Sequence, residues 1–207
     1  MPKISVKSAA ELLRVPAYSQ VRILTEQKYP KSGQQVFRTP YYATALSGIR
    51  AYFKSGKSKS SLFEAKSKIQ SLSQESRREN NFRVLKAFEK SAFSKMPFQL
   101  AKSPKIYASL GSVELKLSPD LRLVDNKQSI VVYVNCRTHP IDEEIARYTL
   151  EIAHWVLEQN RQQLPLRNFI YLDLAKNIEI SFKKRRAKTM DALQQNAKVI
   201  DALWPTL

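Results

Sequence analysis

The chain has 207 residues, of which 43% are hydrophobic and 10% aromatic, and this composition excludes an intrinsically disordered protein. Its formal net charge is +17, and the sequence pI is about 10.0. Most of the excess lies in residues 1–100, which hold 19 Lys/Arg against 6 Asp/Glu. Such a charge favours a polyanionic partner, above all DNA or RNA, although a basic surface can also be merely solvated or dock on an acidic protein.

Several classes of protein are disfavoured by what the sequence lacks. The single cysteine, Cys136, excludes an internal disulfide and a cysteine-based zinc cluster. The four glycines form no phosphate-binding loop, which argues against nucleotide hydrolysis. There is no signal-like N-terminus and no apolar run of about 18 residues, so we expect no membrane contact and a cytoplasmic location.

The first 73 residues are expected to form a basic, mostly helical N-terminal region. The patterns predict helices over residues 8–14, 40–54 and 61–72 and a strand over residues 20–24. Thr39 and Pro40 suit the start of the second helix, and Ser61 with Glu64 has capping-box spacing for the third. The loop between these two helices carries lysines among small residues and suits contact with a phosphate backbone, or is an ordinary solvated turn: Lys54, Lys57 and Lys59.

A long helix is predicted over residues 74–93. Arg83, Lys86 and Lys90 follow three- and four-residue steps and therefore share one face. A basic helical face is usually just solvated, but the basic loop before it favours a nucleic-acid-binding surface.

Three short strands are predicted between residues 112 and 137. Polar and apolar residues alternate over 113–117 and 121–123, and the run 129–134 is almost continuously apolar, as expected for a strand buried on both faces. Pro119 prevents a helix at the first junction, and residues 125–127 offer a polar turn at the second. Asn135 and Arg137 should project together from the end of the last strand, whereas Cys136 should face the core.

The remaining segment is predicted to contain a helix over 141–160, strands over 169–174 and 178–182, and a final helix over 189–203. Four basic residues precede the last helix and suit either phosphate contact or an acidic partner: Lys183, Lys184, Arg185 and Arg186. On the helix over 141–160, spacing places several polar side chains on similar faces, as part of a site or as surface salt bridges: Glu144, Arg147, Glu151 and His154.

The order helix, three strands, helix, strand over residues 74–182 resembles the core of the PD-(D/E)xK phosphodiesterase superfamily, the restriction-endonuclease-like fold. Pro119-Asp120 resembles the PD of its motif, and Asn135-Cys136-Arg137 stands where the (D/E)xK should be. The resemblance implies an α/β (α+β) fold in which residues 74–207 form a central mixed sheet flanked by helices. It also implies that Asp120, Asn135 and Arg137 hold the catalytic positions, with Asp120 as a ligand of Mg²⁺ or Mn²⁺.

The motif departs from the family pattern at two positions. Asn135 offers a neutral amide oxygen, and Arg137 keeps its charge but cannot release a proton. We therefore expect a degenerate site without a cofactor, in a nucleic-acid-binding subunit of a larger DNA- or RNA-processing, defence or mobile-element complex. Two alternatives stay open: a divergent Mg²⁺- or Mn²⁺-dependent nuclease helped by Glu79 or Glu89, and a scaffold subunit that docks on an acidic protein.

Overall fold

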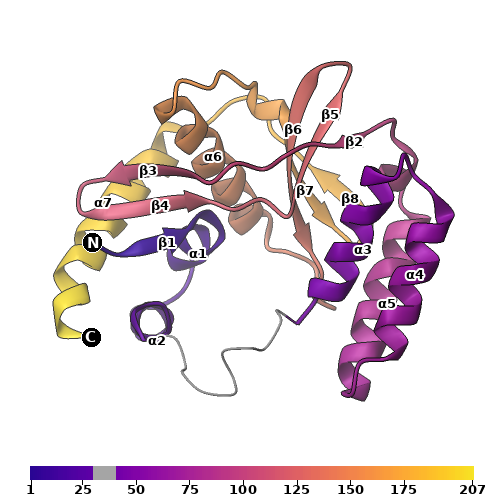
Figure 1. Ribbon diagram of the computed structural model, residues 1–207. Coiled ribbons are helices and arrows are strands. Elements are labelled where there is room, and N and C mark those ends of the chain that lie inside the picture. The colour runs from indigo at the N-terminus through magenta and orange to yellow at the C-terminus, as the bar shows by residue number, and fades with distance from the viewer. Residues whose placement is uncertain (30–40) are drawn as a thin grey trace.

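The computed structural model describes residues 1–29 and 41–207 and shows an α/β fold built on two mixed sheets (Figure 1). The larger sheet has the order β2-β5-β6-β7-β8, and only β6 and β7 in it run parallel. Its strands are β2 (Gln99–Leu100), β5 (Leu121–Asp125), β6 (Gln128–Asn135), β7 (Phe169–Asp173) and β8 (Ile178–Ile180). Asn126 and Lys127 form the turn between β5 and β6, with φ of 45° and 68°, as a two-residue hairpin turn requires.

The smaller sheet joins the N-terminus to the middle of the chain. Its strands are β1 (Lys3–Ser5), β4 (Val113–Leu117) and β3 (Ile106–Leu110), in the order β1-β4-β3. The three strands predicted between residues 112 and 137 are therefore divided, since β4 belongs to this sheet and β5 and β6 to the larger one. The chain changes sheets at residues 118–120, where Pro119 has no N–H to donate to a ladder.

The helices account for most of the remaining chain. The α-helices are α1 (Val6–Leu12), α2 (Ala17–Lys28), α3 (Ala43–Lys54), α4 (Lys59–Gln70), α5 (Glu75–Lys90), α6 (Glu143–Gln159) and α7 (Ala187–Leu203). Short 3-10 helices follow α5, precede β7 and end the chain: η1 (Ala92–Lys95), η2 (Leu166–Asn168) and η3 (Trp204–Thr206). Ser5, Ser58 and Asp142 cap α1, α4 and α6 by accepting a backbone N–H with a side-chain oxygen.

The larger sheet is covered by different helices on its two faces. Along β6, Val131 and Tyr133 pack into one core with α1, α6 and α7. The alternate residues Val132 and Val134 pack into a second core with α3, α4 and α5, which lie side by side in Figure 1 and are here called the three-helix bundle. The prediction that this strand is buried on both faces is confirmed.

Two predicted features of the N-terminal region differ from the structure, and a third lies outside the described residues. The strand over residues 20–24 is wrong, because these residues lie in α2, where Gln20 donates its amide to the carbonyls of Leu12 and Val15 and so ties α2 to the end of α1. The cap of α4 is Ser58 and not Ser61. Thr39 and Pro40 lie outside the described residues.

The predicted boundary at residue 73 is spanned by extensive packing. β1 pairs with β4, and α3 and α4 share a core with α5 and the larger sheet. The N-terminal segments therefore help to shape whatever site lies at the end of β6. Across residues 1–29 and 41–207, no helix combines the length and the apolar character needed to cross a bilayer.

Candidate functional site

A cavity of about 190 Å³ lies at the end of β6. It brings together the three residues that stand at the motif positions, Asp120, Asn135 and Arg137. Two further charged residues, Lys7 and Glu11 of α1, enter it from the N-terminal segment. We call this site the Asp120 cavity.

The carboxylate of Asp120 is held by a cation of the chain itself. Its Oδ2 accepts a hydrogen bond from Nζ of Lys7 at 2.6 Å and one from the backbone N–H of Val134 at 2.8 Å. Nζ of Lys7 also lies 5.6 and 5.8 Å from the ring centroids of Tyr133 and Tyr171. Burial lowers the pKa of Lys7, but the charges of Asp120 and Tyr171 and the hydrogen bond that Lys7 donates to Asp120 outweigh it and raise the pKa overall. Lys7 is therefore a fixed ammonium ion beside Asp120.

The amide of Asn135 ties the ends of two parallel strands together. Its Nδ2 donates to the carbonyl of His139 at 2.8 Å and to the carboxylate of Asp173 at 2.9 Å, and its Oδ1 accepts the backbone N–H of Arg137 at 3.1 Å. Asp173 is buried at the end of β7 and also accepts the backbone N–H groups of Ile141 and Ala175. Asn135 thus stabilises the loop after β6, and its oxygen is engaged by the backbone.

Arg137 and Cys136 point to opposite surroundings. The side chain of Arg137 is 70% exposed and pairs with Glu11 at 3.2 Å, at the outer part of the Asp120 cavity. Cys136 is buried in the core beneath the bundle, and burial raises the pKa of its thiol to about 12. The prediction that Cys136 faces the core is confirmed, and the protonated thiol is unreactive at neutral pH.

The Asp120 cavity offers no unpaired carboxylate to a divalent metal ion. Mg²⁺ needs several oxygen ligands, and the two carboxylates here, Asp120 and Glu11, are already paired with Lys7 and Arg137. In the part of the chain that the structure describes, no cluster of three or more His, Cys, Asp or Glu side chains is arranged for a metal. Glu79 and Glu89 of α5, suggested by the sequence as extra ligands, are not among the residues that line the cavity.

Lysines gather at one end of the three-helix bundle. Because α3, α4 and α5 are joined by short turns, α3 and α5 finish at the end of the bundle where α4 starts. Five lysines lie there, and we call them the bundle-end lysines: Lys54, Lys57, Lys59, Lys90 and Lys95. Nζ of Lys57 donates to the carbonyl of Lys95 at 3.2 Å, which joins the loop after α3 to η1. Among the described residues, none of the five forms a salt bridge.

Arg83 and Lys86, the other two predicted contacts on α5, differ in their surroundings. Nη2 of Arg83 donates to the carbonyl of Cys136 at 2.5 Å, and its Nε is buried without a hydrogen-bond partner in the described part of the chain. Arg83 therefore points toward the end of β6. Lys86 is exposed and lies one helical turn from Lys90, on the same face of α5.

The basic run before α7 lies on the other side of the larger sheet. Nη1 of Arg186 donates a hydrogen bond to each carboxylate oxygen of Glu144, at 2.9 and 3.0 Å. Arg185 pairs with Glu158 and contacts Nδ1 of His154. The other two members of the run, Lys183 and Lys184, are exposed. Half of the run is therefore neutralised by α6, and the predicted basic surfaces do not form one continuous patch.

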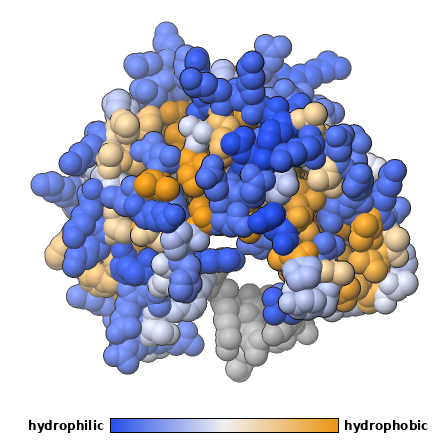
Figure 2. Space-filling model, turned by 180° about the vertical axis from the view of Figure 1, so that it is seen from behind, coloured by the Kyte–Doolittle hydropathy of each residue, from blue (hydrophilic) through white to orange (hydrophobic). Residues whose placement is uncertain are grey.

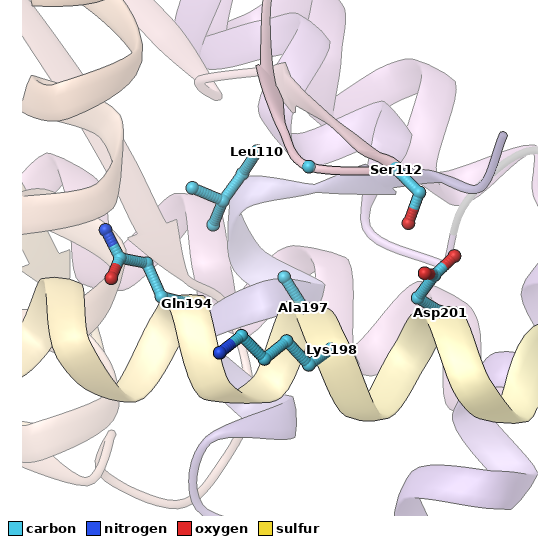
Figure 3. A pocket seen from close by; sticks show the side chains of 7 residues that line it. Leu110, Ser112, Gln194, Ala197, Lys198 and Asp201 are labelled. Atoms are coloured by element: carbon cyan, nitrogen blue, oxygen red, sulfur yellow. The ribbon is translucent and has the colours of Figure 1, made fainter.

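The polar face of α6 serves mainly to hold the start of α7. Glu151 is fully buried, accepts the hydroxyl of Thr189 and lies 3.7 Å from Arg147 and 3.6 Å from Arg186. These contacts and the Arg186–Glu144 pair are salt bridges, but Glu151 is buried, whereas the salt-bridge alternative expected it on the surface. A separate cavity of about 260 Å³ lies between the turn that joins β3 to β4 and residues 194–201 of α7 (Figure 3). None of the predicted site residues lines it.

Sequence reasoning missed Lys7 and Glu11. Their spacing of four places them on one face of a helix, which is a visible signal for a shared role. Nothing in the sequence, however, indicates that this face meets Asp120, which lies 113 positions further along the chain. The parallel pairing of β1 with β4 and the packing of α1 against α6 bring them together.

A comparison with models of known protein families matches none of them, and a comparison with curated protein sequences finds no similar one.

Proposed function

We propose that this chain is a cytoplasmic nucleic-acid-binding subunit that holds backbone phosphates with the bundle-end lysines and does not cut them. The observation that carries the proposal is the convergence of five lysines from α3, α4, α5 and their connections at one end of the bundle, without carboxylate partners among the described residues. Uncompensated lysines attract a polyanion, and each phosphate that they neutralise releases counterions, which favours binding. Such a subunit would serve a DNA- or RNA-processing assembly.

The Asp120 cavity supports the non-catalytic part of the proposal. The order α5, β4, β5, β6, α6, β7 is the order on which the resemblance to the PD-(D/E)xK superfamily rests. At the motif aspartate, the ammonium of Lys7 supplies the positive charge that a metal ion would bring. An ammonium cannot polarise a water molecule as a divalent ion does, so the geometry favours binding over hydrolysis.

The test is a gel assay of the purified chain with labelled single- and double-stranded DNA and RNA, in EDTA, Mg²⁺ or Mn²⁺. We expect shifted but intact substrate under all three conditions, and the same result for Asp120→Ala. Metal-dependent cleavage that Asp120→Ala abolishes would overturn the non-catalytic assignment. The absence of any shift at moderate salt would overturn nucleic-acid binding and favour docking on an acidic protein.

A metal-dependent nuclease is the second candidate, because Glu11 and Asp120 line the same cavity. A divalent ion would meet both carboxylates if it displaced Lys7 and Arg137 from them. The variant Lys7→Met separates the two functions. A nuclease masked by Lys7 would gain cleavage in Mn²⁺, whereas the binding subunit would remain inactive.

A further inference from the structure

A cavity of about 390 Å³ opens beside the bundle-end lysines. Lys59, Phe63 and Lys66 line it from α4, and Glu89 and Ser94 line it from α5 and η1. The ring of Phe63 is 72% exposed. We call this cavity the Phe63 pocket.

The sequence of α4 places an aromatic ring between two lysines. Lys59, Phe63 and Lys66 are spaced by four and three residues and therefore form one stripe along the helix. The neighbouring stripe, which includes Leu62 and Ala65, packs into the bundle core. Phe63 thus leaves its apolar face to solvent on the basic side of α4, where a flat apolar partner would gain by covering it.

The walls of the Phe63 pocket are held in place by contacts that already exist. The hydroxyl of Tyr52 donates to the carbonyl of Ser94 at 3.2 Å, and its ring packs edge-on against Phe88 with centroids 5.6 Å apart. Lys66 and Glu89 join α4 to α5 at 2.7 Å. A ligand that enters therefore pays little to order the site.

Unneutralised positive charge surrounds the pocket. Lys86 and Lys90 lie three residues before and one residue after Glu89 on α5, and both are exposed, as is Lys59 on the facing helix. None of these three lysines has a salt-bridge partner among the described residues. A partner that is flat and apolar at its centre and anionic at its edges would match this charge distribution.

We infer that the Phe63 pocket accepts an unpaired base of single-stranded nucleic acid, which stacks on Phe63 while the flanking phosphates contact Lys59, Lys86 and Lys90. This inference rests on the proposed function and adds its substrate class. Every base has a π face, so stacking on an aromatic ring tolerates any sequence. A duplex keeps its bases stacked inside and offers only phosphates, so the pocket discriminates against it.

The test is fluorescence anisotropy with four labelled probes: oligothymidylate, oligouridylate, a blunt DNA duplex of the same length and an abasic oligonucleotide. Phe63→Leu keeps an apolar side chain without a π face, and Phe63→Trp keeps the π face. We expect Phe63→Leu to weaken single-strand binding about tenfold and to leave duplex and abasic binding unchanged. Phe63→Trp should bind single strands at least as well as the wild type. Tyr18→Leu, at a residue on α2 that is 78% exposed, is the matched control and should bind like the wild type.

The outcomes separate this inference from the proposed function. If Phe63→Leu binds single strands as tightly as the wild type, or loses duplex and abasic binding equally, the base-stacking role is overturned. In that case, weaker binding of all probes after Lys54→Gln with Lys90→Gln would still support phosphate contact by the bundle-end lysines. If the wild type binds none of the probes, the inference and the proposed function both fail. If the wild type binds single strands, the comparison of oligothymidylate with oligouridylate shows which sugar the pocket accepts.

Discussion

The Asp120 cavity and the bundle end both hold clustered charges, but they differ in how those charges are compensated. In the cavity, Lys7 pairs with Asp120 and Arg137 pairs with Glu11. At the bundle end, five lysines face solvent or a backbone carbonyl, and none of them forms a salt bridge in the described structure. Removing one member of a charge pair within a fold leaves the other uncompensated and destabilises the fold, whereas exposed charges without a partner are available to a ligand.

This difference predicts that the two regions respond oppositely to mutation. Substitutions in the Asp120 cavity should lower the free energy of unfolding and leave nucleic-acid binding intact. Substitutions at the bundle end should weaken binding and leave stability intact. The expected change in stability is largest where two helices pack closely and smallest at exposed lysines.

The largest effect is expected at a close contact between α3 and α4, halfway along the two helices and away from the bundle end. A Cβ added at Gly48 would lie 2.4 Å from Cβ of Ala65, so the two helices would have to separate. Gly48→Val should lower the free energy of unfolding by about 3 kcal/mol, measured by urea denaturation. Ala51→Val, at an exposed position on the same helix, controls for the low helix propensity of valine and should cost less than about 1 kcal/mol. Equal costs for both variants would contradict the close approach.

The second-largest change in stability is expected for Lys7, the cation that pairs with Asp120. Lys7→Met keeps the length of the side chain but leaves the carboxylate of Asp120 without its ammonium partner, and should destabilise the fold by about 2 kcal/mol. The matched control is Lys3→Met, because Lys3 pairs with Glu114 at 3.0 Å but is 69% exposed, and such an exposed pair contributes little to stability. If Lys7→Met is as stable as Lys3→Met, the Lys7–Asp120 pair does not stabilise the fold.

The third effect is a loss of stability at alkaline pH. Burial raises the pKa of Tyr171 to about 12 from its ordinary 10.0, while Lys7 opposes and Asp120 reinforces the shift. Above pH 10 the unfolded chain releases this proton and the folded chain keeps it, so stability falls as pH rises from about 10 to 12. At pH 11 this titration should lower the free energy of unfolding by about 1 kcal/mol.

Tyr171→Phe removes this titration, so its free energy of unfolding should fall less between pH 8 and pH 11 than that of the wild type. Tyr18→Phe, on the exposed surface, should retain the wild-type pH dependence. A Tyr171→Phe profile parallel to that of the wild type would contradict the shift.

The smallest change in stability is expected at Lys86 and Lys90, two exposed lysines of α5. Lys86→Gln and Lys90→Gln remove exposed charges without salt-bridge partners among the described residues, so each should change the free energy of unfolding by less than about 0.5 kcal/mol. Both should nevertheless weaken binding of single-stranded oligonucleotides in anisotropy titrations. A clear loss of stability with unchanged binding would reverse the assignment of the two regions.

The sequence predicts best those elements whose pattern is set by their own residues. β6 contains the apolar run over residues 130–134 and α6 has acidic residues in its first turn, and both lie close to where the sequence places them. β1 has three residues and is stabilised by pairing with β4, more than 100 positions away, so no local pattern indicates it. Residues 20–24 favour a strand by their type but lie in α2, where Gln20 bonds to the carbonyls of Leu12 and Val15 at the end of α1.

The candidate site shows the same division. The sequence places Asp120, Asn135 and Arg137 near one another, and it indicates the lysines of the loop after α3. It does not indicate that Lys7 neutralises Asp120, or that Arg83 bonds to a carbonyl at the end of β6. Those contacts depend on how separate segments pack, and packing is not visible in spacing along the chain.

The most direct test of the account is the salt dependence of nucleic-acid binding for three proteins: the wild type, Lys7→Met, and a variant with Lys54→Gln, Lys59→Gln and Lys90→Gln. For single strands, each lost phosphate contact should reduce the slope of log K against log salt concentration by about 0.7, so the triple variant should lose roughly 2. Lys7→Met should keep the wild-type slope. A triple variant with the wild-type slope, or a Lys7→Met variant with a reduced one, would contradict the assignment of binding to the bundle-end lysines.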